Sequence, residues 1–272
     1  MQCPHPIHLR RKDDDGFINY ISVPCGKCPI CLSNRKRDWV FRLKKEMSNC
    51  DSSYFVTLTY DDDHLPRDGL LCKRDVQLFL KRLRKYIYPF KVRYFYVGEY
   101  GDETMRPHYH LLLFNFPHEF DLKCALRDTW QLCSPLQWNL DGVIGSVTGQ
   151  SINYVASYCT KLYPDGRKNI CGMSRRPAIG SSYLTEDTKQ YHKETLNLVS
   201  HDFKNTYRLP RYYRDKIFND YEKAFISYES KKYQKKQEKK WERQYGINWR
   251  FQRFNYLFQK EKDLKERSNS KH

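Results

Sequence analysis

Residues 108–114 constrain the fold of this chain more than any other segment. They read His-Tyr-His followed by Leu-Leu-Leu-Phe. Four consecutive apolar residues are typical of a strand that is buried on both faces, so the segment predicts an inner strand of a covered sheet. In a strand, residues i and i+2 project from the same face, and His108 and His110 therefore point the same way while Tyr109 points to the other side.

Further segments with strand or helix patterns lie on either side of this strand. They are a strand at 54–60, a helix at 75–87, a strand at 92–100, a helix at 121–133 and a short strand at 142–148. A helix capped by Ser151 and running to about Leu162 completes the order β-α-β-β-α-β-α. This order predicts an α+β fold with a largely antiparallel central sheet backed by helices.

Composition divides the chain into three regions. Residues 1–50 hold a cysteine cluster and a basic helical segment, residues 51–210 hold the core patterns, and residues 211–272 form a charged helical extension. No apolar run approaches the ~20 residues of a membrane span, and the first residues lack the apolar stretch of a signal peptide. We therefore expect a protein without membrane contact in a reducing cytoplasm, where cysteines are thiols or metal ligands.

The charge balance predicts a polyanionic partner. Lys and Arg total 49 against 32 acidic residues, which gives a net charge of +17, and aromatic residues make up 15% of the chain. Interleaved basic and aromatic residues are what a single-stranded nucleic-acid groove requires. Candidate contacts are Arg106 and the run Arg35, Lys36 and Arg37. A surface ion pair for Arg106 and a solvated helix face for the run are the ordinary alternatives.

The two histidines form a candidate metal site with Glu99. Glu99 ends the preceding strand, and the connection 101–107 is short enough for a hairpin that places this carboxylate beside His108 and His110. Imidazoles suit transition metals, and an added carboxylate shifts the preference toward Mn²⁺ or Mg²⁺. Three protein ligands leave positions open for water or a phosphate oxygen, as catalysis requires. The alternative is a histidine pair that only decorates a sheet surface.

The helix after the short strand holds a candidate nucleophile. Tyr154 and Tyr158 lie at positions i and i+4 and share a helix face, and Lys161 is close to that face. A nearby ammonium group favours the phenolate, which would attack a DNA phosphate, leave a 5′-phosphotyrosine and free a 3′-hydroxyl primer. Two rings packed on the sheet are the alternative. The combination with the metal motif in one domain favours the nucleophile.

Near the N-terminus, Cys25, Cys28 and Cys31 repeat a two-residue spacing, and Cys3 or His5 is available as a fourth ligand. Three such thiols in a reducing cell are compatible with a structural zinc site. Free or redox-active thiols remain the alternative.

The motifs together resemble a known family. Residues 55–60, the His-Tyr-His triplet and the Tyr154/Tyr158/Lys161 helix occur in the order of the three motifs of HUH-type rolling-circle replication endonucleases. The match is narrower to the replication initiators of gokushovirus-type microviruses. The segments that support it are 23–28, 98–101, 106–108 and 174–180, the last with Ala178 where the family usually has Gly.

This resemblance implies a ferredoxin-like or RNA-recognition-like sheet with the histidine pair on a central strand. It implies Mg²⁺ or Mn²⁺, and two tyrosines that act in turn to open the viral strand at the origin and later rejoin it into a circle. Tyr158 is slightly favoured as first nucleophile, because Lys161 completes a Tyr-x-x-Lys pattern found in single-tyrosine members.

The partner class is then single-stranded viral origin DNA in the cytoplasm of a bacterial host. The chain lacks the helicase phosphate loop Gly-x-x-x-x-Gly-Lys-Ser/Thr, so unwinding and synthesis depend on host helicase and polymerase. Three alternatives stay open. They are a plasmid initiator, relaxase or transposase with the same chemistry, a non-catalytic single-strand binder, and a zinc-stabilised DNA-binding regulator.

Overall fold

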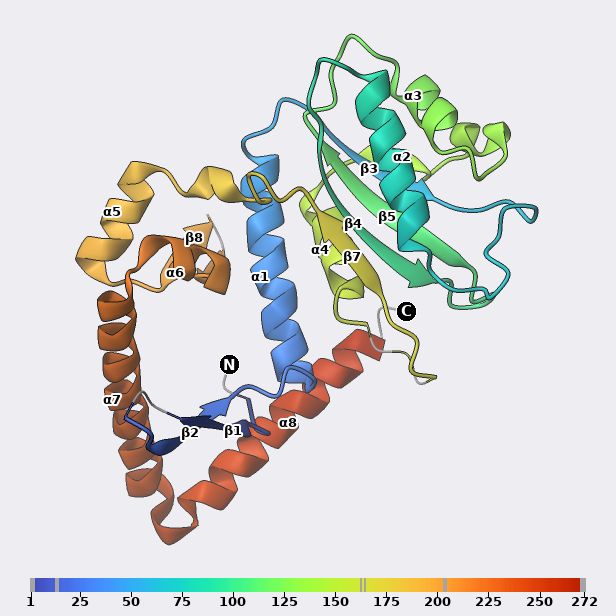
Figure 1. The fold of residues 1–272 in the computed structure, drawn as a ribbon. Helices are drawn as coiled ribbons and strands as arrows, with labels where there is room; N and C mark the ends of the chain where they lie inside the picture. The colour runs from blue at the N-terminus through green and yellow to red at the C-terminus, as the bar shows by residue number, and fades with distance from the viewer. Residues whose placement is uncertain (1–2, 13–14, 162, 164, 203–204, 270–272) are drawn as a thin grey trace. The chain divides into compact units, whose positions relative to one another are not determined.

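The computed structural model describes residues 3–12, 15–161, 163, 165–202 and 205–269 (Figure 1). The chain forms two compact units: a sheet unit, Trp39–Thr185, and a helical unit that joins Met1–Asp38 to Glu186–His272. These bounds differ from the three regions suggested by composition, and that division stays a prediction. None of the described helices has the length and apolar character that a bilayer span requires.

The sheet unit is built on a five-stranded antiparallel sheet with the order β6-β3-β5-β4-β7. The strands are β3 Ser53–Leu58, β4 Arg93–Tyr100, β5 Pro107–Phe114, β6 Ile144–Ser146 and β7 Ile170–Met173. β5, which carries the histidine pair, is the middle strand, and its residues Leu111 to Phe114 are fully buried. The expected α+β fold and the inner strand are thus confirmed.

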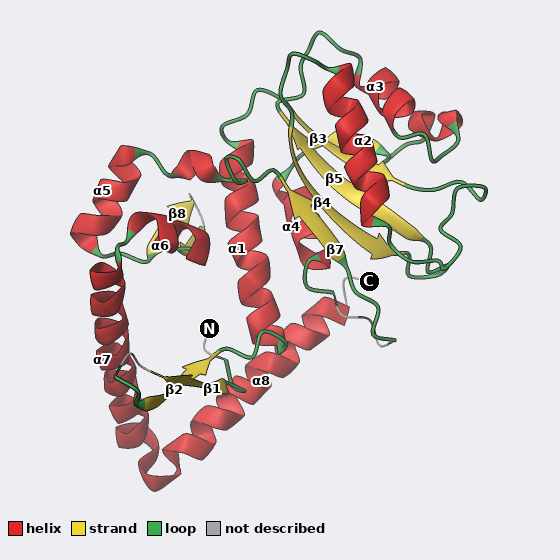
Figure 2. Ribbon diagram, in the orientation of Figure 1, coloured by secondary structure: helices red, strands yellow, loops and turns green. Residues whose placement is uncertain are grey.

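Helices cover both faces of this sheet (Figure 2). On one face pack α2 (Lys73–Tyr86) and α3 (Leu122–Thr129), and on the other pack α4 (Gly149–Tyr158) and the second half of α1 (Pro29–Met47). The apolar residues of α2, at i, i+3, i+4 and i+7, are Val76, Phe79, Leu80 and Leu83, and all are buried. They form one core with Tyr109, Leu111 and Leu113, which share a face of β5.

Two predicted helix boundaries were wrong. The cap of α4 is Thr148: its hydroxyl accepts from the Ser151 backbone N–H at 3.1 Å, and the Ser151 hydroxyl accepts in return from the Thr148 N–H at 2.7 Å. Ser151 is therefore the third helical residue of a capping box. The helix ends at Tyr158, and Leu162 lies outside the described residues. α3 ends at Thr129, before Cys133, because Trp130 leaves the helical conformation and its ring enters the core.

The helical unit contains the remaining elements. Its strands form two hairpins, β1 Ile7–Lys12 with β2 Ile18–Val23 and β8 Val199–Asp202 with β9 Asn205–Arg208. Its helices after α1 are α5 Glu186–Thr195, α6 Arg211–Ile217, α7 Asp220–Tyr245 and α8 Trp249–Asn269. The charged C-terminal extension is helical, as its sequence indicates.

Candidate metal and nucleophile site

The sheet register brings the three predicted metal ligands together. Glu99 on β4 lies opposite His108 on β5. The Oε1 atom of Glu99 is 2.9 Å from Nε2 of His108 and 2.7 Å from Nε2 of His110. One ligand atom from each residue lies within 4.8 Å of the others, so the set could hold one metal ion. Glu99 and His110 are buried, and His108 is partly exposed.

The second ring nitrogens of both histidines have partners that fix the rings. Nδ1 of His108 is 3.2 Å from the backbone oxygen of Arg106, which can only accept, so this nitrogen carries the proton. Nδ1 of His110 is 3.3 Å from the Thr57 hydroxyl on β3. Metal-binding histidines are typically held this way, because the outer partner aims the Nε2 lone pair at the ion. Nothing in the sequence singles out Thr57.

The electrostatics of Glu99 fit a metal ligand. Burial raises the pKa of this carboxyl, but hydrogen bonds with His108 and His110 outweigh burial and lower the pKa to about 2. Its second oxygen, Oε2, is buried without a hydrogen-bond partner, and the nearest charge is the Lys161 ammonium at 3.7 Å. A buried carboxylate oxygen without a donor requires an explanation, and a bound cation supplies one. The residues present therefore fit a divalent ion.

The two tyrosines of α4 contact this site in different ways. The Tyr154 hydroxyl is 3.5 Å from Nε2 of His110, and its side chain is 45% exposed. Tyr158 is only 4% exposed, and its ring stacks on His110 with centroids 5.3 Å apart. Phe55 stacks on the opposite side of His110 at 5.5 Å. His110 is therefore held between two rings, one of which belongs to Tyr158.

Lys161 lies at the same site, but it faces carboxylates rather than a phenol oxygen. Its Nζ is 2.7 Å from Asp102 and 3.7 Å from Glu99, and it lies 5.4 Å above the Tyr158 ring. Burial raises the pKa of both Tyr154 and Tyr158. Lys161 thus offsets the negative charge of Glu99 and Asp102, and both phenols are protonated at neutral pH.

The comparisons with known proteins agree with this geometry. Residues 53–163, which contain every residue of the site, match the family described as replication-associated protein ORF2/gene 2 protein. The chain is 31% identical over 231 residues to the replication-associated protein VP4 of Bdellovibrio phage phiMH2K, covering 77% of this chain and 72% of that protein. It belongs to this family of replication-associated proteins.

Two further relatives have related names. The replication-associated protein ORF2 of Spiroplasma virus 4 is 31% identical, with 76% of this chain and 72% of that protein covered. The replication-associated protein ORF4 of Chlamydia phage 1 is 29% identical, with 79% and 59% covered. No solved structure matches the chain significantly. The predicted resemblance to microvirus replication proteins is thus confirmed.

The basic residues predicted to bind DNA occupy different positions in this family member. Arg106 pairs with Asp62 at 2.7 Å and donates to the Tyr60 backbone oxygen. Arg37 donates to the backbone oxygen of Thr206 at 2.7 Å. Arg35 is exposed and Lys36 is half-buried on α1. DNA contact by these four residues stays a prediction.

The cysteine cluster is assembled with Cys3 as its fourth member. One Sγ–Sγ distance is 3.8 Å, between Cys3 and Cys28, and another is 3.9 Å, between Cys25 and Cys31. All four sulfurs lie within 4.8 Å of one another. His5, the alternative fourth ligand, instead pairs with Glu261 at 3.0 Å. Gly26 in the turn has a φ of +75°, a left-handed conformation that glycine adopts without strain.

Proposed function

We propose that this chain is a rolling-circle replication initiator that nicks the single-stranded viral origin and later rejoins the strand. The observation that carries the proposal is the position of the Tyr154 hydroxyl, 3.5 Å from a ligand atom of the Glu99, His108 and His110 set. A nucleophile and an open cation site at this separation can share one phosphate. The names of the relatives support a role in replication.

The proposed reaction is a transesterification without redox change. The tyrosine oxygen attacks the phosphorus, a bond from that oxygen to the 5′-phosphate forms, and the bond from phosphorus to the 3′-oxygen breaks. The phenolic proton leaves to solvent, and the departing 3′-oxygen takes up one proton to become a hydroxyl primer. Rejoining reverses these steps, with a 3′-hydroxyl attacking the phosphotyrosine.

The residues of the site divide the work. Glu99, His108 and His110 would hold Mg²⁺ or Mn²⁺, which polarises a phosphate oxygen and stabilises the charge that develops on it. Arg106 and Thr57 orient the two imidazoles. Asp102 holds the Lys161 ammonium beside Glu99, where it offsets the carboxylate charge.

We further propose that Tyr154 acts first. It is the exposed tyrosine, whereas Tyr158 is buried as one ring of the stack around His110. This order differs from the one that the Tyr-x-x-Lys pattern suggests, because Lys161 lies over the ring of Tyr158 and not at its hydroxyl. Tyr158 would act in the second step, after Tyr154 is bonded to DNA.

The test is a covalent adduct. The chain is incubated with a single-stranded origin oligonucleotide and Mn²⁺, and a protein–DNA band is expected on a denaturing gel. EDTA, or replacement of both Tyr154 and Tyr158 by Phe, should remove that band while salt-sensitive binding persists. The proposal fails if no cognate viral strand gives an adduct, or if the double variant still gives one. Binding without any adduct would identify a non-catalytic single-strand binder.

The remaining assignments follow from this function. The relatives belong to bacteriophages and related viruses of bacteria, so we propose that the chain acts in the host cytoplasm. Host helicase and polymerase would then unwind the duplex and extend the 3′-hydroxyl.

We also propose that the four cysteines hold a structural Zn²⁺. A tetrahedral ion with Zn–S bonds of about 2.3 Å requires sulfurs about 3.8 Å apart, close to the two Sγ–Sγ separations given above. Burial raises the pKa of Cys25, but hydrogen bonds from the backbone N–H groups of Lys27 and Cys28 outweigh burial and lower the pKa to about 6. A thiolate is the form that binds zinc.

Cys28→Ser is expected to remove this zinc. The purified chain should contain close to one zinc per molecule by atomic emission, and the variant only a small fraction of that. Because metal binding is coupled to folding, thermal unfolding should shift down by several degrees or more. Cys171→Ser, at an exposed cysteine of β7, is the control and should keep the zinc. Reduced, zinc-free protein with wild-type stability would contradict the assignment.

A further inference from the structure

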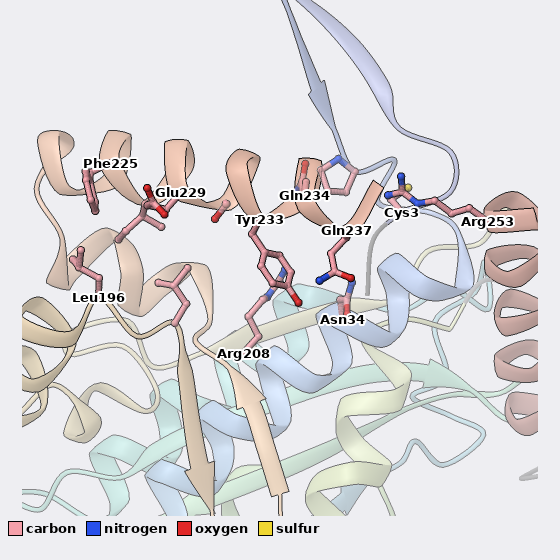
Figure 3. Close-up of a pocket in the computed structure, with 14 residues that line it drawn as sticks. Cys3, Asn34, Leu196, Arg208, Phe225, Glu229, Tyr233, Gln234, Gln237 and Arg253 are labelled. Atoms are coloured by element: carbon pink, nitrogen blue, oxygen red, sulfur yellow. The ribbon is translucent and has the colours of Figure 1, made fainter. Parts of the chain in front are cut away.

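The helical unit has a hollow of about 870 Å³, which is within the range of about 300–1,000 Å³ typical of ligand sites (Figure 3). One face of α7 forms much of its wall, with Tyr233, Gln234 and Gln237 at i, i+1 and i+4. Figure 3 shows Tyr233 and Gln237 projecting from α7 toward Arg208 of β9 and Asn34 of α1. None of these residues belongs to the metal and nucleophile site.

The lining of the hollow changes from apolar to polar along its length. Leu196 and Phe225 lie at one end, and Arg253 lies at the other (Figure 3). Between them, the ring of Tyr233 is 64% exposed. The amides of Gln234 and Gln237 have no hydrogen-bond partner among the described residues. An open aromatic ring beside amides that can both donate and accept suits a nucleobase, which has a flat face and a hydrogen-bonding edge.

Arg208 connects the hollow to a cluster of positive charge. Asp38 of α1 faces the guanidinium groups of Arg208, Arg214 and Arg37, with the Arg208 nitrogen 3.5 Å from its carboxylate. One carboxylate cannot balance three guanidinium groups. Burial lowers the pKa of Arg214, and the charge of Arg208 lowers it further. The Nε atom of Arg214 is also buried without a hydrogen-bond partner. These features favour an anion at the Arg208 end of the cluster.

The acidic residues near the hollow do not cancel this charge. Glu229, which lines it, pairs with Lys232 at 3.5 Å. Exposed lysines flank the lining face of α7, at Lys231, Lys232, Lys235 and Lys236. A groove with basic flanks and an open ring is what a single strand of nucleic acid requires.

We propose that this hollow binds a nucleotide of single-stranded DNA outside the nicking site, with its phosphate on Arg208 and its base against Tyr233 and the amides of Gln234 and Gln237. The inference rests on the proposed function, because the strand bound here would be the one that is nicked. A base read by two amides adds sequence preference, so the hollow would contribute to the choice of origin.

The test measures binding separately from cleavage. The full chain with both Tyr154 and Tyr158 replaced by Phe is titrated into a fluorescein-labelled single-stranded origin oligonucleotide, and anisotropy gives the affinity. Adding Tyr233→Ala should weaken binding about tenfold, as expected for loss of one stacked base. Tyr228→Ala, at an exposed tyrosine of α7 that does not line the hollow, should change affinity less than about twofold.

The phosphate contact has its own measurement. Arg208→Gln should lower the slope of log affinity against log salt by about 0.7, the value for one phosphate of a single strand. Arg243→Gln removes the same charge from an exposed position of α7 and should leave the slope unchanged. Gln237→Ala should reduce the preference for the origin over a scrambled strand.

The outcomes separate the two proposals. The hollow is ruled out as a DNA site if Tyr233→Ala and Arg208→Gln behave like their controls, a result that a protein occupant would also give. Should Arg208→Gln misfold by circular dichroism, the exposed Tyr233 variant decides. In chains with intact nucleophiles, adducts at saturating DNA should persist in the hollow variants. Loss of affinity without adducts from any chain would refute the nickase and leave the hollow standing.

Discussion

A Tyr158→Phe chain is expected to open the origin strand at close to the wild-type rate, whereas Tyr154→Phe should lose that step by at least about 10³-fold. Phenylalanine at position 158 keeps the ring that stacks on His110, at a centroid distance of 5.3 Å, so the metal ligand stays oriented. At position 154, the same change removes the only phenol oxygen of the pair that is well exposed to substrate.

The measurement is the initial rate of adduct formation on an origin oligonucleotide with excess Mn²⁺. Joining is followed separately, by the yield of closed circles from a substrate that carries two origins. Tyr158→Phe should give adducts but few circles, because the second nucleophile is missing. Equal loss of the opening step in both variants, or loss only in Tyr158→Phe, would contradict the proposed order.

A third variant separates the ring of Tyr158 from its hydroxyl. Tyr158→Leu removes both, so His110 keeps only the Phe55 ring, 5.5 Å away, as a stacking partner. We expect this variant to lose part of the opening step that Tyr158→Phe keeps. Identical opening rates for the Leu and Phe variants would show that the stack does not position His110.

Much of the sheet unit could be predicted because its patterns are local. The four apolar residues after His110 identify the central strand, and the spacing of Val76, Phe79, Leu80 and Leu83 identifies α2. β7 has no such signal. Its four residues include Gly172, which is needed because a Cβ there would meet the Tyr96 ring at 2.4 Å. That requirement depends on a strand more than 70 positions earlier in the chain.

The hairpin β1–β2 escaped prediction for a different physical reason. Nearly all of its residues are exposed, so neither strand has a buried face that would impose an alternating pattern. Turn-forming residues and β propensity alone do not distinguish such a hairpin from a loop.

The candidate site was predictable only where its geometry is local. Glu99 and His108 are joined by a short connection, so a hairpin places them opposite each other whatever the rest of the chain does. The Thr57–His110 pair depends on the register between two strands 53 positions apart. The Lys161–Asp102 pair likewise joins a helix end to a hairpin turn. Sequence pattern specifies which face a side chain takes, but not which distant residue it meets.

Glu99→Gln is expected to have the other large effect, with a loss of Mn²⁺ affinity of at least about 100-fold, beyond the 10–100-fold typical of outer partners of metal ligands. Glutamine keeps the size of the side chain but removes its negative charge. Its amide N–H would also point at the Nε2 lone pairs that are now 2.7 and 2.9 Å from the carboxylate. Adduct formation should fall in parallel, and raising the Mn²⁺ concentration should restore part of it.

The control for this variant is Glu103→Gln, at an exposed residue of the same hairpin connection. It removes an equal charge without touching the histidines, so it should leave both Mn²⁺ affinity and adduct rate within about twofold of wild type. Titration of Mn²⁺ followed by electron paramagnetic resonance reports binding without any need for activity. If Glu99→Gln binds Mn²⁺ as well as Glu103→Gln does, the carboxylate is not a ligand. Its short contacts would then serve only to hold the two histidines in place.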